Sequence, residues 1–233
     1  MTILGVESSA TAASAAIIQD GKLLSEIFSD TGLTHSQTLL PMIDSCIKNA
    51  GISVEQVDSI AVANGPGSFT GVRIGIATVK GLAFTNNIPC VQVSTLESMA
   101  YNIPIFGGII CSVMDARCNQ VYTAFFENTD GCKVNRLSED TAISIDELGE
   151  KIANYGKSVI LVGDGAEICY NKLKEKCNSL YLASINTRKQ KASSVAMCSM
   201  NYEGMDAEKI AVNYIRLPQA QRELAKKQSL SKN

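Results

Sequence analysis

The sequence predicts an α/β fold built from two similar lobes, each a mixed β-sheet flanked by helices. The chain has 233 residues, 45% of them hydrophobic, which is enough for one large core or two small ones. The order strand, loop, strand, turn, strand, followed by a helix and a further strand, occurs twice, starting near residues 3 and 108. We therefore expect lobes at residues 1–103 and 104–233, with the linker near residues 102–107.

In the first lobe, apolar runs predict strands over residues 3–6, 14–18 and 22–28. Asp20 and Gly21 supply the tight turn between the second and third strands. A helix is expected over residues 39–50. It should end at Gly51, with Pro41 in its first turn or at a kink.

A glycine-rich turn at residues 64–67 joins a short buried strand, residues 60–63, to a helix that is almost free of polar residues. Ser68 is expected to cap this helix. A helix N-terminus behind such a turn can hold an anion. The Walker spacing and the dinucleotide fingerprint are both absent, so a plain strand-to-helix turn explains the residues equally well.

Both helices of the first lobe carry two separate apolar stripes on a helical wheel. On the second helix one stripe comprises Val72, Ile76, Val79 and Ala83, and the other Gly71, Gly75, Thr78 and Leu82. On the first helix the stripes are Leu40, Ile43, Ile47 and Ala50, and Leu39, Met42 and Cys46. One stripe is enough to cover a sheet, so the second indicates either deeper burial within the chain or contact with a partner's helix.

In the second lobe, strands are expected over residues 108–114 and 120–126, joined by the turn at 115–119. Asp130 and Gly131 support a further hairpin. Ser144 and Glu147 form a capping-box pattern for a helix that ends before Gly156, and residues 159–162 form the next strand. The polar tail at residues 221–233 is assigned no function.

Composition limits the function in two ways. The net charge of −2 is not that of an independent nucleic-acid-binding protein, so any contact with RNA needs a partner's surface. The eight cysteines are scattered without a Cys-x-x-Cys pair, which argues against structural zinc and indicates reduced thiols in a cytoplasmic protein. No apolar run approaches the ~20 residues that span a bilayer, so we expect no membrane association.

The run from Gly65 to Ala83 resembles the signature of the TsaB (YeaZ) family of bacterial tRNA-modification proteins. Residues 3–9, 34–41, 114–117, 120–122 and 162–165 also match that family in the same order, so the similarity spans nearly the whole chain. The resemblance implies a two-lobed actin-like fold of the sugar-kinase and Hsp70-ATPase type. It also implies a non-catalytic subunit that binds and activates a TsaD-type transferase, which forms threonylcarbamoyladenosine next to the tRNA anticodon.

The implied partners are the TsaD-type subunit in a heterodimer and a TsaE-type ATPase in a larger complex, with tRNA contacted only through the complex. Without its partner the chain should form a homodimer through the same surface. The resemblance places that interface on the two striped helices. Its residues would be Leu39, Leu40, Met42, Ile43, Cys46, Ile47, Gly71, Val72, Gly75, Ile76, Thr78, Val79 and Leu82. Residues 213–218 look like the family's closing motif and would anchor the last segment across the lobes.

A nucleotide-dependent kinase or ATPase is the alternative, because the fold hosts many such enzymes. Glu7, Ser8 and Ser9 stand where actin-like ATPases carry Asp-x-Gly, but the loop has no Lys or Arg to match phosphate charge. We interpret Glu7 as a structural or vestigial acid. A vestigial nucleotide cleft would comprise Glu7, Ser8, Ser9, Asp115, Arg117, Gly163, Asp164 and Gly165. For the Asp115–Arg117 pair and the glycine turn at 162–165 we favour structural roles, such as an internal salt bridge or a strand-to-helix turn.

A glycoprotease-like peptidase is the weaker alternative. TsaD-type proteins hold a metal with a His-x-x-x-His pair, and by alignment Thr95 and Met99 occupy those positions here, where they are poor ligands. Ser94 and Glu97 instead form a capping box. His35 is the only histidine, and we interpret it as a helix-start residue bonded to the backbone rather than a general base. We therefore expect no catalytic residue, no metal and no cofactor.

Overall fold

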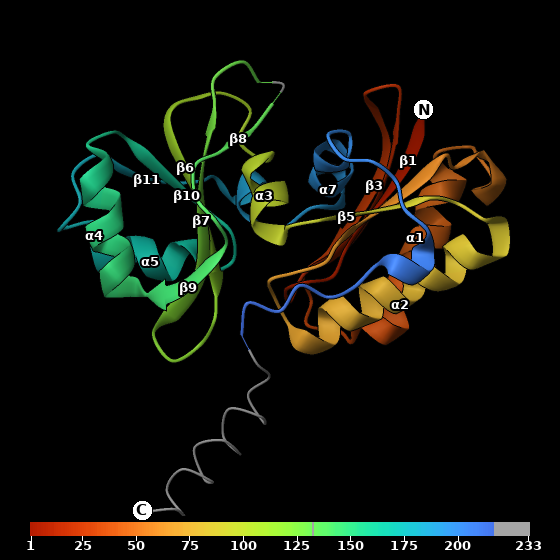
Figure 1. The fold of residues 1–233 in the computed structure, drawn as a ribbon, viewed down its shortest axis with the longest axis horizontal. Helices are drawn as coiled ribbons and strands as arrows, with labels where there is room; N and C mark the ends of the chain where they lie inside the picture. The colour runs from red at the N-terminus through yellow and green to blue at the C-terminus, as the bar shows by residue number, and fades with distance from the viewer. Residues whose placement is uncertain (132, 217–233) are drawn as a thin grey trace, which may run out of the picture.

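Two lobes stand side by side in the computed structural model, which describes residues 1–131 and 133–216 (Figure 1). Each lobe is a β-sheet with helices packed on it, as the sequence predicts. The polar tail at 221–233 lies outside the described residues.

The first lobe contains a five-stranded sheet in the order β3-β2-β1-β4-β5. Its strands are β1 (Thr2–Glu7), β2 (Ala13–Gln19), β3 (Lys22–Ser29), β4 (Ser59–Ala63) and β5 (Cys90–Val93). Strand β1 runs antiparallel to β2 and parallel to β4. Helices α1 (His35–Asn49) and α2 (Phe69–Asn86) cover one face, and α7 (Ala192–Ser199) covers the other. The central strands are therefore buried on both sides.

The second lobe contains a six-stranded sheet in which β11-β10-β6-β7-β8 are neighbours and β9 also pairs with β7. Its strands are β6 (Phe106–Asp115), β7 (Gln120–Asn128), β8 (Asn135–Arg136), β9 (Thr141–Ser144), β10 (Val159–Val162) and β11 (Leu180–Leu182). Helices α4 (Ile145–Tyr155) and α5 (Ala166–Leu173) pack on one face. The short helices α3 (Thr95–Ala100) and α6 (Ile185–Arg188) precede and follow this sheet in the chain.

Helices α3 and α7 join the lobes. One continuous core cluster includes Leu96 of α3, Val195 of α7, Ala61 of the first sheet and Phe126 of the second. Because buried apolar side chains resist separation, this cluster fixes the two sheets to each other along one side of the molecule.

The chain after residue 190 returns to the first lobe. Ser14 Oγ of β2 accepts a hydrogen bond of 2.8 Å from the backbone N–H of Ala192, and Met205 pairs with Cys90 at the edge of β5. This differs from the expectation of one lobe over 104–233, because α7 covers a sheet face that the N-terminal half leaves bare. We keep a boundary near residue 103 as a proposal.

Helix α1 begins earlier than predicted, at His35 instead of Leu39. Pro41 consequently lies inside the helix and not in its first turn. The prediction followed the preference of proline for a first turn. In the structure the His35 ring bonds the carbonyl oxygen of Ala10 at 2.8 Å, which ties the first turn of α1 to the β1–β2 loop.

Candidate functional site

Helix α2 begins as the sequence predicts. Ser68 is its N-cap, and the Ser68 Oγ accepts a hydrogen bond of 3.2 Å from the backbone N–H of Gly71. The first apolar stripe of α2, which comprises Val72, Ile76, Val79 and Ala83, is buried and packs in the cluster beneath the first sheet, although three of these residues were also expected at the interface.

The glycine stripe of α2 faces the chain's own β1–β2 loop and not a partner. A Cβ on Gly75 would lie 2.4 Å from Ser8 Oγ, and a Cβ on Gly71 would lie 2.2 Å from the Ser8 carbonyl oxygen. Ser8 Oγ also donates a hydrogen bond of 3.0 Å to the Gly71 carbonyl oxygen. The small residues therefore allow close packing inside the monomer, which corrects their assignment to an interface.

Most of the predicted interface is similarly internal. The buried members are Leu39, Met42, Ile43, Cys46, Gly71, Val72, Gly75, Ile76 and Val79. The members that reach the surface are Leu40, which is 52% exposed, and the half-buried Ile47, Thr78 and Leu82. A wheel shows two apolar stripes, but it does not show that one of them meets another part of the same chain.

A further face of α2 reaches the surface, and we call it the free face. It comprises the exposed Thr70, Ala77 and Gly81 together with the half-buried Ile74 and Thr78, of which Thr78 is also a member of the predicted interface. Phe84, near the end of the helix, is 80% exposed. The spacing of these residues at three and four positions was a usable sequence signal, but their small side chains made the stripe look neutral. The free face and Leu40 form the candidate surface for contact with another protein.

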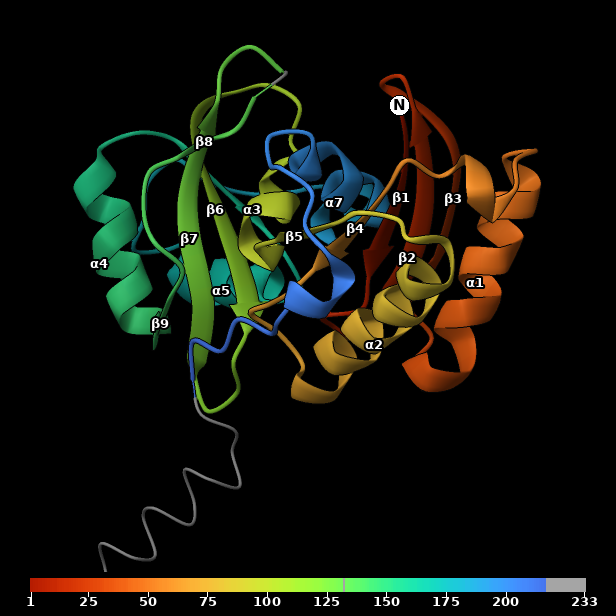
Figure 2. The ribbon, with the colours of Figure 1, turned by 45° about the vertical axis from the view of Figure 1, so that its right-hand side comes forward.

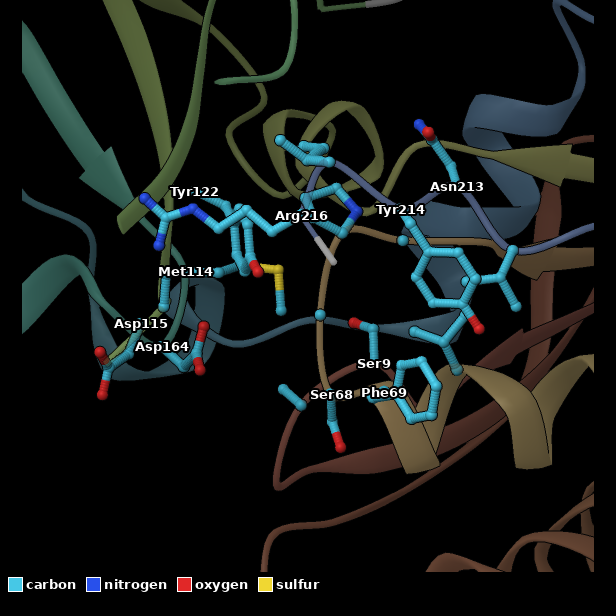
Figure 3. A pocket seen from close by; sticks show the side chains of 18 of the residues that line it. Ser9, Ser68, Phe69, Met114, Asp115, Tyr122, Asp164, Asn213, Tyr214 and Arg216 are labelled. Atoms are coloured by element: carbon cyan, nitrogen blue, oxygen red, sulfur yellow. The ribbon is translucent and has the colours of Figure 1, made fainter. Parts of the chain in front are cut away.

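A cleft of about 520 Å³ lies between the lobes. Of the residues predicted to form a cleft, it brings together Ser9, Asp115, Arg117 and Asp164. Figure 3 shows Ser9, Ser68 and Phe69 on one wall and Asp115 and Asp164 on the opposite wall. The other predicted residues, Glu7, Ser8, Gly163 and Gly165, are not among its lining residues, and Glu7 and Ser8 are buried.

The base of the cleft is acidic, because Asp164 lines it and the buried Glu7 interacts electrostatically with Asp164. Glu7 is fully buried, and its Oε1 accepts a hydrogen bond of 2.6 Å from the Ser9 N–H. Burial raises the pKa of Glu7 to about 7, although the bonds from Ser9 act in the opposite direction. Burial also raises the pKa of Asp164, whose Oδ1 accepts a hydrogen bond of 2.8 Å from Gln190 Nε2.

Three oxygen atoms near this base have no hydrogen-bond partner among the described residues. They are Glu7 Oε2, Ser9 Oγ and Gln190 Oε1, all buried. Buried polar atoms in folded proteins are nearly always bonded, so a group that supplies donors or positive charge would fit here. Of the three residues only Ser9 lines the cleft, so its Oγ is the atom that favours a polar ligand bound there.

The turn after β6 is held by its own backbone. Asp115 Oδ1 accepts a hydrogen bond of 2.8 Å from the N–H of Arg117, and Arg117, Cys118 and Asn119 all have positive φ. The group that Asp115 bonds is therefore the backbone amide of Arg117 and not its guanidinium. The expected structural role is therefore supported, but the expected internal salt bridge is not.

Thr95 and Met99 are fully buried in α3, within the core that joins the lobes. Only half of the expected capping box forms. Ser94 Oγ accepts from the Glu97 N–H at 3.3 Å, but the Glu97 carboxylate accepts from Arg136 and Tyr202 instead of returning to the helix start. Over residues 1–131 and 133–216, no three His, Cys, Asp or Glu side chains are grouped to hold a metal ion.

The last described segment crosses the mouth of the cleft. Residues 211–216, which we call the strap, run beside α2 and then reach β7 of the second lobe (Figure 2). Val212 to Arg216 line the cleft. The only sequence signal for this segment was the resemblance of residues 213–218 to the closing motif of the family.

In the part of the chain that the structure describes, no helix is long and apolar enough to cross a membrane. The seven cysteines within that part are free thiols, and only Cys118 is exposed.

Comparisons with known proteins agree with one another. The family model of TsaD, tRNA N6-adenosine threonylcarbamoyltransferase, matches residues 29–222. The chain is 26% identical to the tRNA threonylcarbamoyladenosine biosynthesis protein TsaB of Bacillus subtilis, over 95% of this chain and 96% of that protein. It is 30% identical to TsaB of Escherichia coli, over 71% of this chain and 72% of that protein.

Solved structures give the same result. YeaZ from Pseudomonas aeruginosa superposes with a TM-score of 0.77 at 26% identity, covering 91% of this chain and 99% of that one. The ethanolamine utilization protein EutJ from Carboxydothermus hydrogenoformans, at 12% identity and a TM-score of 0.51, covering 84% of this chain and 89% of that one, shares the fold alone. The two-lobed fold is of the actin-like type, as predicted.

Proposed function

The chain belongs to the TsaD family and, within it, to the TsaB (YeaZ) group, and from this membership we propose that it is a partner subunit in forming threonylcarbamoyladenosine in tRNA. In this role it binds and activates a TsaD-type transferase, which carries the chemistry. The observation that carries the proposal is the free face of α2 together with the exposed Leu40 of α1. Leu40, Ala77 and Phe84 leave apolar surface in contact with water, which a helical partner could bury.

We propose that the chain has no catalytic site of its own. Its single histidine, His35, is committed to the backbone of Ala10. Thr95 and Met99, which align with the metal-binding histidines of TsaD-type proteins, are sealed in the core. These residue types and positions support a structural role for α3 in place of a metal centre.

The wider assembly is also a proposal. A TsaE-type ATPase would join the complex of the two actin-like subunits, and tRNA would be contacted through the complex because this chain has a net charge of −2. In isolation the chain would form a homodimer through the free face, since a two-fold pair of helices is self-complementary.

A nucleotide-dependent activity is the second candidate, and one observation favours it. Ser9 lines the cleft, and its buried Oγ has no hydrogen-bond partner among the described residues, which suits a bound polar ligand. The acids of the cleft weigh against a bare phosphate group, because Asp115 and Asp164 line it and Glu7 lies beneath. Nucleotide-dependent protection against thermal unfolding would test this candidate. No observation favours a peptidase.

The interface can be tested with a matched pair of charge substitutions. Ala77→Glu places a carboxylate on the free face, and Ala153→Glu places the same group on an exposed position of α4 in the second lobe. Gly75→Glu is unsuitable, because it would disrupt the contact with Ser8 inside the monomer.

The measurement is molar mass by light scattering after size-exclusion chromatography, with and without the TsaD-type protein of the same organism. We expect a one-to-one complex for the unchanged chain and for Ala153→Glu, and affinity at least about tenfold weaker for Ala77→Glu, as a buried unpaired charge predicts. The isolated homodimer should also dissociate in Ala77→Glu. Independent elution of the two unchanged proteins would contradict the proposed function.

A further inference from the structure

We infer that the strap, residues 211–216, couples α2 mechanically to the second lobe. Binding of a partner at the free face of α2 then changes how far the inter-lobe cleft opens. The inference rests on the proposed function, because it takes the partner surface to be α2. It adds a mechanical link that membership of the family does not supply.

The strap is pinned first to the sheet of the first lobe. The N–H of Asn213 donates to the Asn64 carbonyl oxygen at 2.8 Å, and the N–H of Ala211 donates to Gln92 Oε1 at 3.1 Å. A Cβ on Gly65, whose φ is +117°, would lie 2.7 Å from the Asn213 carbonyl oxygen. The glycine turn therefore also serves to let the strap pass over it.

The strap then packs against the first turn of α2. The Tyr214 ring stacks on Phe69 with centroids 5.3 Å apart, and the Tyr214 hydroxyl accepts a hydrogen bond of 2.7 Å from Arg73 Nε. The Arg73 guanidinium lies 3.6 Å from the centroid of the Phe69 ring. Arg73 lies three positions after Thr70 and four before Ala77, both of the free face, so a helix that docks there meets this cluster at its edge.

Two residues further on, the strap reaches the other lobe. Arg216 Nη1 donates a hydrogen bond of 2.6 Å to Gln120 Oε1 at the start of β7. In Figure 3 the Arg216 side chain extends toward Tyr122, and the guanidinium lies 5.9 Å from that ring's centroid. Only Ile215 separates Tyr214 from Arg216. Two residues span at most about 7 Å, so a large displacement of Tyr214 would pull on Arg216.

The strap also divides the space between the lobes. Asn213 and Ile215 line the cleft of about 520 Å³ and also a second cavity of about 530 Å³, which contains Glu97 and Arg136. Moving these residues would join the two cavities. The strap is held by separate hydrogen bonds, one ring stack and the partly buried Val212, and Tyr214 is 44% exposed, so we expect the strap to open at lower cost than the core.

The inference can be tested by measuring a distance between the lobes. Cys118, exposed on the β6–β7 turn, carries one spin label, and Lys22→Cys at the exposed start of β3 carries the other, in a Cys132→Ser background. Pulsed electron paramagnetic resonance reports the distance distribution with and without the TsaD-type protein. The variant is Tyr214→Ala, and its matched control is Tyr181→Ala, an exposed tyrosine of β11.

We expect the partner to shift the distance in the unchanged chain and in Tyr181→Ala. Tyr214→Ala should broaden the distribution in the isolated chain and remove the partner-dependent shift, while the mass of the complex stays the same. Tyr214→Phe keeps the ring stack but loses the hydrogen bond to Arg73, so its distance shift should lie between those of the unchanged chain and Tyr214→Ala. This variant keeps the test valid if the alanine variant does not fold.

The outcomes separate this inference from the proposed function. A complex that forms without any change in distance, or a Tyr214→Ala chain that responds like the unchanged one, overturns the inference and leaves the function standing. If no complex forms, the function fails and the coupling fails with it. In that case the distance in isolated Tyr214→Ala still decides whether the strap holds the lobes together.

Discussion

Glu7 accepts a hydrogen bond of 2.6 Å from the backbone N–H of Ser9, while its second carboxylate oxygen is buried without a partner. The bond positions the β1–β2 loop against the cleft, and the unpaired oxygen makes the ionised form costly there. Burial of the Glu7 carboxyl outweighs the bond from Ser9 and gives the protein a pH-dependent stability.

Stability should fall as pH rises from about 4.5 to about 7. Burial raises the folded-state pKa of Glu7 to about 7 from 4.5, so over this range the folded chain holds a proton that the unfolded chain has released. The loss is on the order of 3 kcal/mol for a shift of this size. Glu7→Gln, which cannot ionise, should flatten this dependence and be the more stable protein at pH 8.

Urea unfolding at pH 5 and pH 8 measures the free energy of unfolding of both proteins, with the exposed Glu150→Gln as control. Parallel pH profiles for Glu7→Gln and the unchanged chain would contradict the prediction.

Two glycines of α2 should respond in opposite directions to alanine. At Gly75 the added Cβ would lie 2.4 Å from Ser8 Oγ, so Gly75→Ala should destabilise by about 1–3 kcal/mol. At Gly81 nothing lies within 4 Å, so Gly81→Ala should stabilise by about 0.5–1 kcal/mol through helix propensity. Chemical denaturation of the two variants measures the difference. Equal effects would mean that the Ser8 contact does not limit the position of α2.

The ion pairs of Arg136 should contribute far more to the stability of the fold than an ion pair on the surface does. Arg136 bonds Glu97 Oε2 at 2.8 Å and Asp140 Oδ1 at 2.6 Å, and both carboxylate side chains are only 10% exposed. Burial alone would lower the pKa of Arg136, but these two partners outweigh it and raise the pKa. Arg136→Met leaves two acids unpaired and should cost about 2–4 kcal/mol.

The control for this pair is Lys157→Met, which removes an exposed contact with Glu127 and should cost below about 1 kcal/mol. Thermal unfolding of both variants checks the contrast. A loss for Arg136→Met no larger than that for Lys157→Met would show that the network adds little to stability.

Thiol reactivity should be confined to one described cysteine. Cys118 is exposed, whereas burial raises the pKa of both Cys111 and Cys169 to about 12. In a Cys132→Ser background, a thiol reagent at pH 8 should therefore modify one cysteine quickly and the others only on unfolding. Cys118→Ser removes the fast phase. Fast reaction of several thiols in native Cys118→Ser would indicate that the core opens far more readily than the structure implies.

Much of the fold could be predicted because it depends on neighbouring residues. Short apolar runs predict β1, β2 and β4, and Asp20–Gly21 and Ser68 mark a turn and a cap that form as expected. The error at the start of α1 has a tertiary cause, since His35 is held by Ala10, 25 residues away. The half-formed capping box at Ser94 has the same kind of cause, because Arg136 and Tyr202 attract the Glu97 carboxylate from outside the helix.

The sequence by itself determined the two-lobed α/β plan, the buried stripe of α2 and the resemblance to one family. Only the tertiary structure decided which remaining face of α2 is open to solvent. From the helix alone, Gly71 and Gly75 are expected to form a docking stripe, but Ser8, 63 residues before Gly71 in the chain, packs against both. The face that remains free includes Ile74, Ala77 and Gly81. Local periodicity determines which side chains share a face of a helix. What covers that face depends on segments distant in the chain, here the β1–β2 loop and the strap, and no pattern within the helix encodes them.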